Sequence, residues 1–402
     1  MDNLYELLIP LLFGAAFLGA FRSGLLRYFG RKPLLTVAFA TLLGLVSLNW
    51  GWAEVNAETL RHMTRAGLAF LVFLAAQQCR ISRLISISKP IFWLGILGIP
   101  FSLLLYTMTA FVILPGLTFW GILIVASALI LGGALTQDHL LLEAPVERDT
   151  KRAARLEGAM TLLLGLPLAL LLEKGSSPVM VGTPIHLHPL FLSVAGFTVG
   201  GAIGLLSGRF LPLSPQSPLP VLPFLVAAFT YALSLLLGLD SVMAALGAGL
   251  LFSEEAKIPG PVRTNLWRTG ERFLRPLALI AFGYVLMPLM LKADFLIWIV
   301  ATVIILVVRP LSRFIILQTR GDLALQDRTF LTWFGGAPGV GCILFLLSLM
   351  ASPAAMIEDT SMALATAIVV VGLVVTRLFT KPLTTRLVQE TARARKKKYR
   401  PA

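Results

Sequence analysis

Long apolar runs follow one another along almost the whole chain, and they constrain its fold more than any other feature. Of the 402 residues, 57% are hydrophobic and only 13% are charged, whereas a soluble domain carries about 25% charged residues. An unpaired backbone amide in hydrocarbon costs several kcal/mol, so an apolar run of about 20 residues crosses a membrane as a helix. The sequence therefore predicts an all-α polytopic membrane protein.

Thirteen apolar runs are candidate transmembrane helices, with boundaries that are loose by several residues. Their approximate cores are residues 4–21, 33–48, 66–78, 90–114, 121–136, 156–172, 189–205, 221–237, 241–252, 273–291, 295–316, 330–350 and 362–379. We divide the chain into a transmembrane region, residues 1–380, and a basic tail, residues 381–402. The first residues lack the basic segment and cleavage site of a signal peptide, so we expect the first run to remain as a helix.

The positions of the cations predict the orientation, because Lys and Arg are held on the cytoplasmic side. With thirteen spans and the N-terminus outside, only four of the 34 Lys and Arg residues fall in outer loops, namely Arg61, Arg65, Lys174 and Lys292. The net charge of +14 would suggest nucleic acid in a soluble protein. Here the basic tail, TARARKKKYRPA, is expected to contact anionic lipid on the cytoplasmic face of a bacterial inner (plasma) membrane.

Small residues and cysteines inside the runs are expected to serve packing. Gly196, Gly200 and Gly204 share one helical face, which allows a second helix to approach closely. Cys79 and Cys342 lie in or beside apolar runs, so we expect reduced thiols and no disulfide.

The end of the fifth run, SALILGGALTQDHLLLE, brings polar residues to membrane depth. Gly132 and Gly133 weaken the helix there, and Thr136, Gln137 and Asp138 follow. A helix interrupted at this point frees carbonyls and helix ends to bind a small ion, as in transporters with discontinuous helices. The alternative is that Asp138 marks only the cytoplasmic boundary of the span.

The twelfth run, FLTWFGGAPGVGCILFLL, is predicted to break near its start at Gly335, Gly336, Pro338 and Gly339. No Lys-Ser or Lys-Thr follows these glycines, so they do not form a nucleotide-binding loop. The broken fifth and twelfth helices occupy corresponding places if spans one to six and eight to thirteen are inverted repeats around a linker helix. That arrangement is typical of the central site of a transporter.

Two charged residues lie at the ends of apolar runs. Glu157 begins the sixth run and Arg309 lies late in the eleventh, so they are either boundary residues or a buried charge pair. The sequence has no HExxH, no GxSxG and no Cys/His cluster, so neither an enzyme nor a cofactor is expected. His186 and His188 offer two metal ligands without a partner set, which favours interfacial side chains over a metal site.

Four segments, in this order and spacing, resemble the monovalent cation/proton antiporter superfamily along nearly the whole chain. They are GLAFLVFLAAQQCRISRL, LGLDSVMAALGAGLLFSEE, RPLSRFI and DRTFLTWFGGAPGVGCILFLL. The resemblance implies a sodium/proton exchanger-like fold of thirteen helices, with inverted repeats and discontinuous helices 5 and 12. It also implies a homodimer, in which a core domain that holds the ion moves like an elevator against a dimerisation domain.

Two of the family's site features have matching positions in this chain. Thr136 and Asp138 match a Thr-Asp-Pro type motif, although Gln137 is interposed and His139 replaces the proline. Arg309 lies where the resemblance places a structural arginine. By this resemblance, Thr136, Gln137 and Asp138 bind the ion.

The sixth run departs from the family pattern. Where members resemble Glu-Gly-Glu-Ser-Leu-Leu-Asn-Asp, this chain reads EGAMTLLL from Glu157, with Ala159, Leu163 and Leu164 replacing the second Glu, the Asn and the final Asp. A cation needs oxygen ligands, and coupling to protons needs a carboxylate that titrates.

Three hypotheses about function follow from this departure. Asp138, together with Glu157, has taken over the exchange of a monovalent cation for protons. Alternatively, the chain carries a different substrate, such as an anion drawn to Arg309 and helix N-termini. The third hypothesis is a transport-silent membrane scaffold, sensor or subunit.

Overall fold

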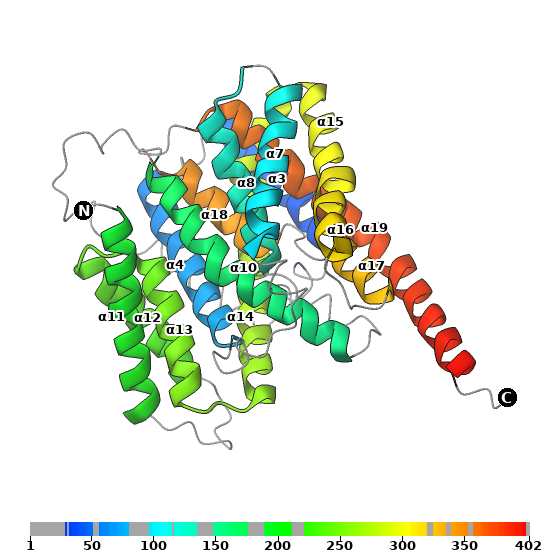
Figure 1. Ribbon diagram of the computed structural model, residues 1–402. Coiled ribbons are helices and arrows are strands. Elements are labelled where there is room, and N and C mark those ends of the chain that lie inside the picture. Colours follow the sequence, from blue (N-terminus) through cyan, green and yellow to red (C-terminus); the bar gives the residue numbers. More distant parts are fainter. Residues whose placement is uncertain are drawn as a thin grey trace.

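The computed structural model describes most of the helical part of the chain (Figure 1). The described residues are 29, 32–50, 56–79, 96–114, 116–134, 148–175, 189–210, 221–319, 325–334, 339–352 and 357–398. Every regular element within these ranges is a helix, as the apolar runs predict. The first predicted run, residues 4–21, lies outside the described residues.

The predicted runs from the second to the thirteenth each coincide with one helix or a continuous series of helices, except that the twelfth contains two separate helices, α17 and α18. These are α3 (Pro33–Trp50), α4 (Ala57–Ala76), α7 (Gly98–Ile113), α8 (Phe119–Ala134), α10 (Arg148–Gly175), α11 (Pro189–Phe210), α12 (Val221–Leu236), α13 (Ser241–Glu255), α14 (Gly260–Ala281) with η3 (Phe282–Leu286) and η4 (Met287–Lys292), α15 (Phe295–Val303) with η5 (Ile304–Val308) and α16 (Arg309–Thr319), α17 (Leu325–Phe334), α18 (Val340–Met350) and α19 (Asp359–Lys398). By length and hydropathy, four described helical segments suffice alone to cross a bilayer. They are Leu190–Phe210, Val262–Met290, Phe295–Gln318 and Asp359–Phe379.

Helix α4 starts earlier than the apolar run that predicts it. The side-chain oxygen of Asn56 accepts hydrogen bonds from the backbone N–H groups of Glu58 and Thr59, at 2.9 and 3.4 Å. This cap satisfies two of the amides that a helix start leaves without partners. Arg61 and Arg65, predicted in an outer loop, therefore lie within the first turns of the helix. Hydropathy misses these turns because they are polar.

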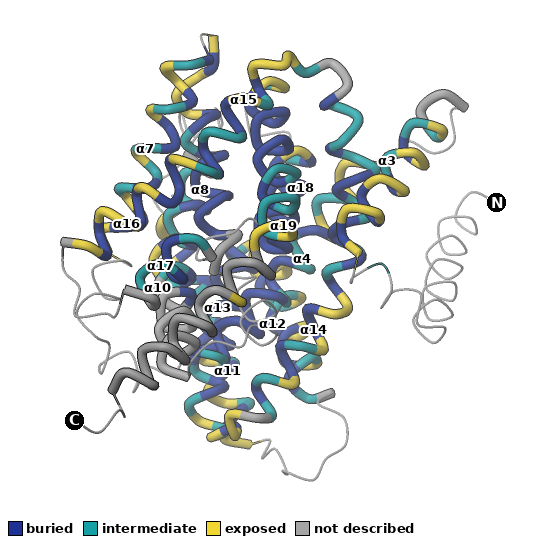
Figure 2. Tube along the Cα trace, turned by 90° about the vertical axis from the view of Figure 1, so that its right-hand side faces the viewer, coloured by how far each residue is buried: buried dark blue, intermediate teal, exposed yellow. Residues whose placement is uncertain are grey.

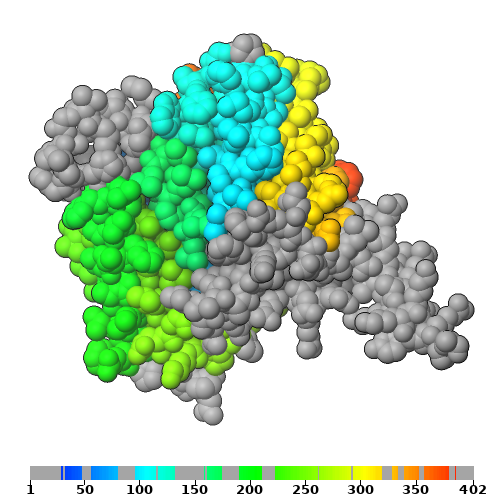
Figure 3. Space-filling view, viewed as in Figure 1, coloured from blue at the N-terminus to red at the C-terminus, as the bar shows by residue number. Residues whose placement is uncertain are grey.

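The helices form two bundles that lie side by side (Figure 1). The first, which we call the α13 bundle, comprises α3, α4 and α11 to α14, and α13 packs against α4, α11 and α12. The second, the α8 bundle, comprises α7, α8, α10 and α15 to α19, and α8 packs against α7, α10 and α18. Figure 3 shows helices of both bundles on one face of the molecule, the α13 bundle in green and the α8 bundle largely in cyan and yellow.

Large apolar side chains cover the outside of both bundles. Figure 2 shows buried residues along the helix faces that look inward, and exposed residues along the faces that look outward. Phe39, Phe191, Phe229 and Phe295 are among the exposed aromatic residues. In water such a surface would be an aggregation hazard, whereas lipid tails solvate it.

Close contact between α11 and α13 depends on the three glycines that share a face of α11. A Cβ atom built on Gly200 would lie 1.9 Å from the carbonyl oxygen of Ala244, and one on Gly204 would lie 2.2 Å from that of Ala248. A Cβ on Gly196 would lie 2.6 Å from the carbonyl oxygen of Asp240. These backbone atoms cannot move aside as a side chain does, so the packing role predicted for the stripe is confirmed.

We predict that Gly200→Ala destabilises the protein by about 1–3 kcal/mol, because the new methyl group forces α11 away from α13. The matched control is Gly67→Ala on α4, where a Cβ would meet only the side chains of Leu344 and Leu274, at 3.5 and 3.6 Å. Thermal unfolding in detergent measures both variants. Equal midpoints for the two variants would show that the α11–α13 contact tolerates separation.

Candidate functional site

The twelfth predicted run is two helices rather than one. Helix α17 ends at Phe334 and α18 begins at Val340. Gly339, directly before α18, has an extended backbone with φ −146° and ψ −160°. Gly339 therefore interrupts the helical run directly before α18. Gly335, Gly336 and Pro338 lie outside the described residues.

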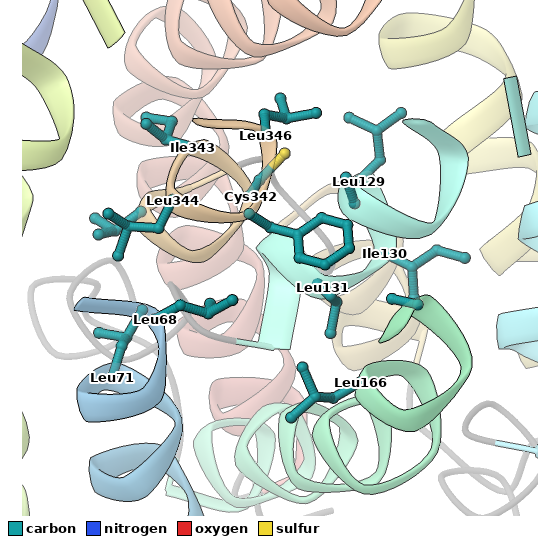
Figure 4. Close-up of a cluster of buried hydrophobic side chains, with 14 of the residues drawn as sticks. Leu68, Leu71, Leu129, Ile130, Leu131, Leu166, Cys342, Ile343, Leu344 and Leu346 are labelled. Carbon is teal, nitrogen blue, oxygen red and sulfur yellow. The ribbon is translucent and has the colours of Figure 1, made fainter. Parts of the chain in front are cut away.

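The end of α8 lies beside the start of α18. Figure 4 shows Leu129, Ile130 and Leu131, in the last turns of α8, on the side of α18 to which Cys342, in its first turn, belongs. The residues predicted to bind an ion, Thr136, Gln137 and Asp138, follow the end of α8 at Ala134 and lie outside the described residues. The described helix before the first predicted break, α8, and the described helix after the second, α18, thus pack against each other in the α8 bundle.

Two arginines of α16 cap the C-terminal end of α17. Arg309 donates a hydrogen bond from Nη2 to the carbonyl oxygen of Trp333, and Arg313 donates from Nε to that of Leu331 at 3.0 Å. Both side chains are buried. The last four carbonyls of a helix have no partner within it, and this end carries a partial negative charge. The guanidinium groups satisfy these carbonyls where the helix stops.

A π-helical turn, η5, sets the direction of the two arginines. It ends at Val308, so Arg309 is the first residue after it. The extra residue in a π turn rotates the following residues around the helix axis. As a result Arg309 and Arg313, four residues apart, share the face of α16 that contacts α17, while Leu311 and Phe314 are exposed.

Hydroxyl groups from α7 and α16 surround the arginines. Ser102 donates a hydrogen bond to Ser312 at 3.1 Å, and the Tyr106 hydroxyl bonds to both serines. The hydroxyls of Thr107 on α7 and Thr332 on α17 are buried and have no hydrogen-bond partner among the described residues. Buried polar groups without partners usually mark a place for a ligand, an ion or a water molecule.

The neighbouring surfaces of α8, α10 and α18 are apolar. Leu166 on α10 is fully buried in the cluster of Figure 4, and Leu162, one turn earlier, is also fully buried. Leu164, which the sequence resemblance aligns with a family Asp, is 42% exposed. Glu157 lies within α10, but its side chain is outside the description, so its pairing with Arg309 stays a prediction.

Sequence reasoning missed Arg313 and the hydroxyl groups around it. The spacing in RPLSRFI carried a signal, since two arginines one helical turn apart in an apolar run share a face. The predicted partner of Arg309 was a carboxylate, whereas the described partner is the carbonyl of Trp333. Only the fold brings that carbonyl to the arginine, across 24 positions of sequence.

We predict that Arg313→Gln destabilises the protein by about 1.5–3 kcal/mol, the usual contribution of a hydrogen bond to a charged group. Hydrogen exchange should accelerate in α17, because its C-terminal turn loses a cap, and stay unchanged in α11. Arg272→Gln, at an exposed position of α14, is the control and should leave both quantities as they are. Unchanged exchange in α17 after Arg313→Gln would contradict the capping role.

Comparison with known proteins agrees with this architecture. The family described as sodium/hydrogen exchanger, transmembrane, matches residues 9–386. A structure of the sodium proton antiporter MjNhaP1 from Methanocaldococcus jannaschii at pH 8 has a TM-score of 0.63 at 14% identity, covering 90% of this chain and 98% of that one. A 3D electron-microscopy map of the same antiporter gives a TM-score of 0.65 at 16% identity, covering 99% of each chain. Curated proteins gave no significant match.

The two kinds of match support different conclusions. The structural likeness, at this low identity, shows a shared fold, which is an all-helical polytopic membrane fold. The family match covers nearly the entire sequence and confirms the predicted resemblance at the level of the family. Members of this family are membrane transporters and not enzymes, in agreement with the motifs that the sequence lacks. The chain therefore belongs to the sodium/hydrogen exchanger family.

Proposed function

We propose that the protein is a secondary transporter that exchanges a monovalent cation, with Na⁺ the first candidate, for protons. The observation that carries this proposal is the interrupted helix between α17 and α18, held by two buried arginines. A helix end and two buried arginine side chains inside a membrane protein cost free energy, and a span with a purely structural role needs neither. Transporters use such helix ends to bind their ions near the middle of the membrane.

Asp138 is the titrating residue in this proposal. Its carboxylate alternates between the cation and a proton, while Thr136 and Gln137 supply further oxygen ligands. Carbonyls of the unwound segment at Gly335, Gly336, Pro338 and Gly339 complete the site. The support is the adjacency of the α8 end and the α18 start (Figure 4). The Thr332 hydroxyl, buried at the end of α17, offers one more oxygen.

Arg309 and Arg313 are positioning residues rather than ligands of the transported ion. They hold α17 by its last carbonyls and leave positive charge beside the break. Carboxylates at the start of α10 and after α8 balance that charge, and we assign Glu157 to this role beside Arg309. An anionic substrate is less favoured, because each arginine already directs an N–H group to a backbone carbonyl.

A transport-silent relative is the second candidate function. It is favoured by the leucines of α10, since Leu163 and Leu164 replace the polar pair of the family and the α8–α10–α18 contact is apolar (Figure 4). Such a protein would keep the fold as a membrane scaffold, sensor or subunit. The capped break argues against it, because a silent scaffold gains nothing from an interrupted helix.

The proposed setting is a homodimer in an inner (plasma) membrane, with the N-terminus outside and the C-terminus in the cytoplasm. Helix α19 continues to Lys398 and projects from the bundle (Figure 1). The basic residues of ARARKKK therefore extend the last span as a helix, which suits contact with anionic lipid at the membrane surface. The division into a membrane domain, 1–380, and a tail, 381–402, belongs to the same proposal.

We predict that purified protein in liposomes moves protons when a Na⁺, K⁺ or Li⁺ gradient is imposed, and that Asp138→Asn abolishes this flux. The amide keeps the size of the carboxylate but neither titrates nor carries a charge for the cation. A pH-sensitive dye inside the liposomes reports the flux. Asp359→Asn, at the exposed start of α19, is the matched control and should transport normally.

The outcomes separate the candidate functions. If none of the three cation gradients drives proton flux in the wild-type protein, cation exchange is rejected and the transport-silent relative is favoured. Flux that survives Asp138→Asn would keep the class of function but reject the titrating residue. Flux driven by an anion gradient alone would favour the altered substrate.

A further inference from the structure

An arginine and two carboxylates meet where α4, α10 and α13 come together. Arg65 on α4 forms a hydrogen-bonded ion pair from Nη2 to Oε1 of Glu173, near the end of α10. The Glu173 side chain is only 5% exposed and that of Arg65 is 24% exposed. Asp240, the residue that caps the start of α13, is buried and also attracts the Arg65 guanidinium.

This ion pair crosses from one bundle to the other. Arg65 and Asp240 belong to the α13 bundle, whereas Glu173 belongs to the α8 bundle. The hydrogen bonds of Arg309 to Trp333 and of Arg313 to Leu331, by contrast, lie inside the α8 bundle. An ion pair with hydrogen-bond geometry is directional, so it fixes the position of α10 relative to α4.

Away from this ion pair, α4 meets the α8 bundle through an apolar surface on α18. Helix α4 packs against α18, where Leu68 and Leu71 lie near Leu344 (Figure 4). A Cβ atom on Gly67 would also meet only the Leu344 and Leu274 side chains, at 3.5 and 3.6 Å. Apolar contacts have no directional preference, so they allow one bundle to shift against the other without broken hydrogen bonds.

We propose that the Arg65–Glu173 ion pair is a latch that holds the two bundles in the conformation seen here and opens when the α8 bundle moves. This inference rests on the proposed transport function and on the topology that puts Arg65 near the outer surface. The latch then closes the outer side of the α4–α10 interface. Transport requires its opening once in each cycle.

Asp240 explains how the latch opens at an acceptable energetic cost. A buried arginine that loses its only carboxylate is strongly destabilised. Here a second carboxylate, that of Asp240 at the start of α13, belongs to the same bundle as Arg65, so its attraction for the guanidinium persists when Glu173 leaves. The arginine stays neutralised in both positions of the α8 bundle.

The test measures how readily the interface between the bundles opens. A cysteine introduced as Gly67→Cys faces Leu344 and reacts with a membrane-impermeant maleimide only when α4 and α18 separate. We predict that Glu173→Gln, which keeps the size but removes the charge, speeds this labelling from the outside by about fivefold. Full-length protein in liposomes is used, and protein with only Cys79 and Cys342 supplies the background.

The control reporter is Gly201→Cys, which faces Leu251 inside the α13 bundle. Its labelling should be equal with and without Glu173→Gln, because α11 and α13 do not separate. Equal labelling of the Gly67→Cys reporter in both backgrounds would overturn the latch. Faster labelling of both reporters would also overturn it, since that result reports general loosening of the protein.

Cross-linking gives a second measurement that does not need an open latch. The double variant Arg65→Cys/Glu173→Cys, bridged by a bifunctional methanethiosulfonate, should lose transport and regain it when a reductant cleaves the bridge. Bridged Gly201→Cys/Leu251→Cys joins two helices of one bundle and should transport normally. Full transport with the first bridge in place would overturn the latch.

The two proposals fail separately. Thiol labelling needs no transported ion, so accelerated labelling in a protein without cation flux would reject the transport function and keep the movement of the bundles. Conversely, cation flux sensitive to Asp138→Asn, together with labelling that ignores Glu173→Gln, would reject the latch and keep the transport function.

Discussion

The carbonyls at the end of α17 set the constraint on which the described site depends. Inside a membrane protein water does not satisfy them, and α18 does not continue the helix. Arg309 and Arg313 meet this need from α16, and η5 turns both toward α17. The serines and Tyr106 then tie α16 to α7. The relative positions of three helices thus follow from two orphan carbonyls.

Helix α10 connects this site to the boundary between the bundles. Glu157 lies in its third turn and Glu173 near its end, and the 16 residues of helix between them correspond to about 24 Å. Between them Leu162 and Leu166 are buried, and Leu166 packs in the cluster formed with α8 and α18. These buried leucines hold α10 within its bundle. When the α8 bundle moves, α10 therefore carries Glu173 together with the candidate ion site.

Local sequence patterns were enough to predict the helices, the break after Phe334 and the close approach at Gly200, because each depends on residues within one helix or its immediate neighbour. Contacts between distant segments were not predictable in the same way. Arg65 and Glu173 are 108 positions apart, and no periodicity joins them. The capped start of α4 was missed because a hydropathy scan does not register Asn56. The sequence resemblance alone predicts a departure from the family pattern at Leu164, but the exposure of this side chain could be found only from the folded structure.

The two helix ends at the break carry opposite partial charges, and the described side chains balance only one of them. The C-terminal end of α17 is negative and receives two arginines, whereas the N-terminal end of α18 is positive and follows Gly339, which has no side-chain oxygen to accept its first N–H groups. A carboxylate suits that end, and Asp138 comes four residues after α8, whose last turns lie beside the first turns of α18 (Figure 4). If Asp138 serves there, binding of a cation or a proton changes the charge that the α18 end experiences. Occupancy of the site would then act directly on the broken helix.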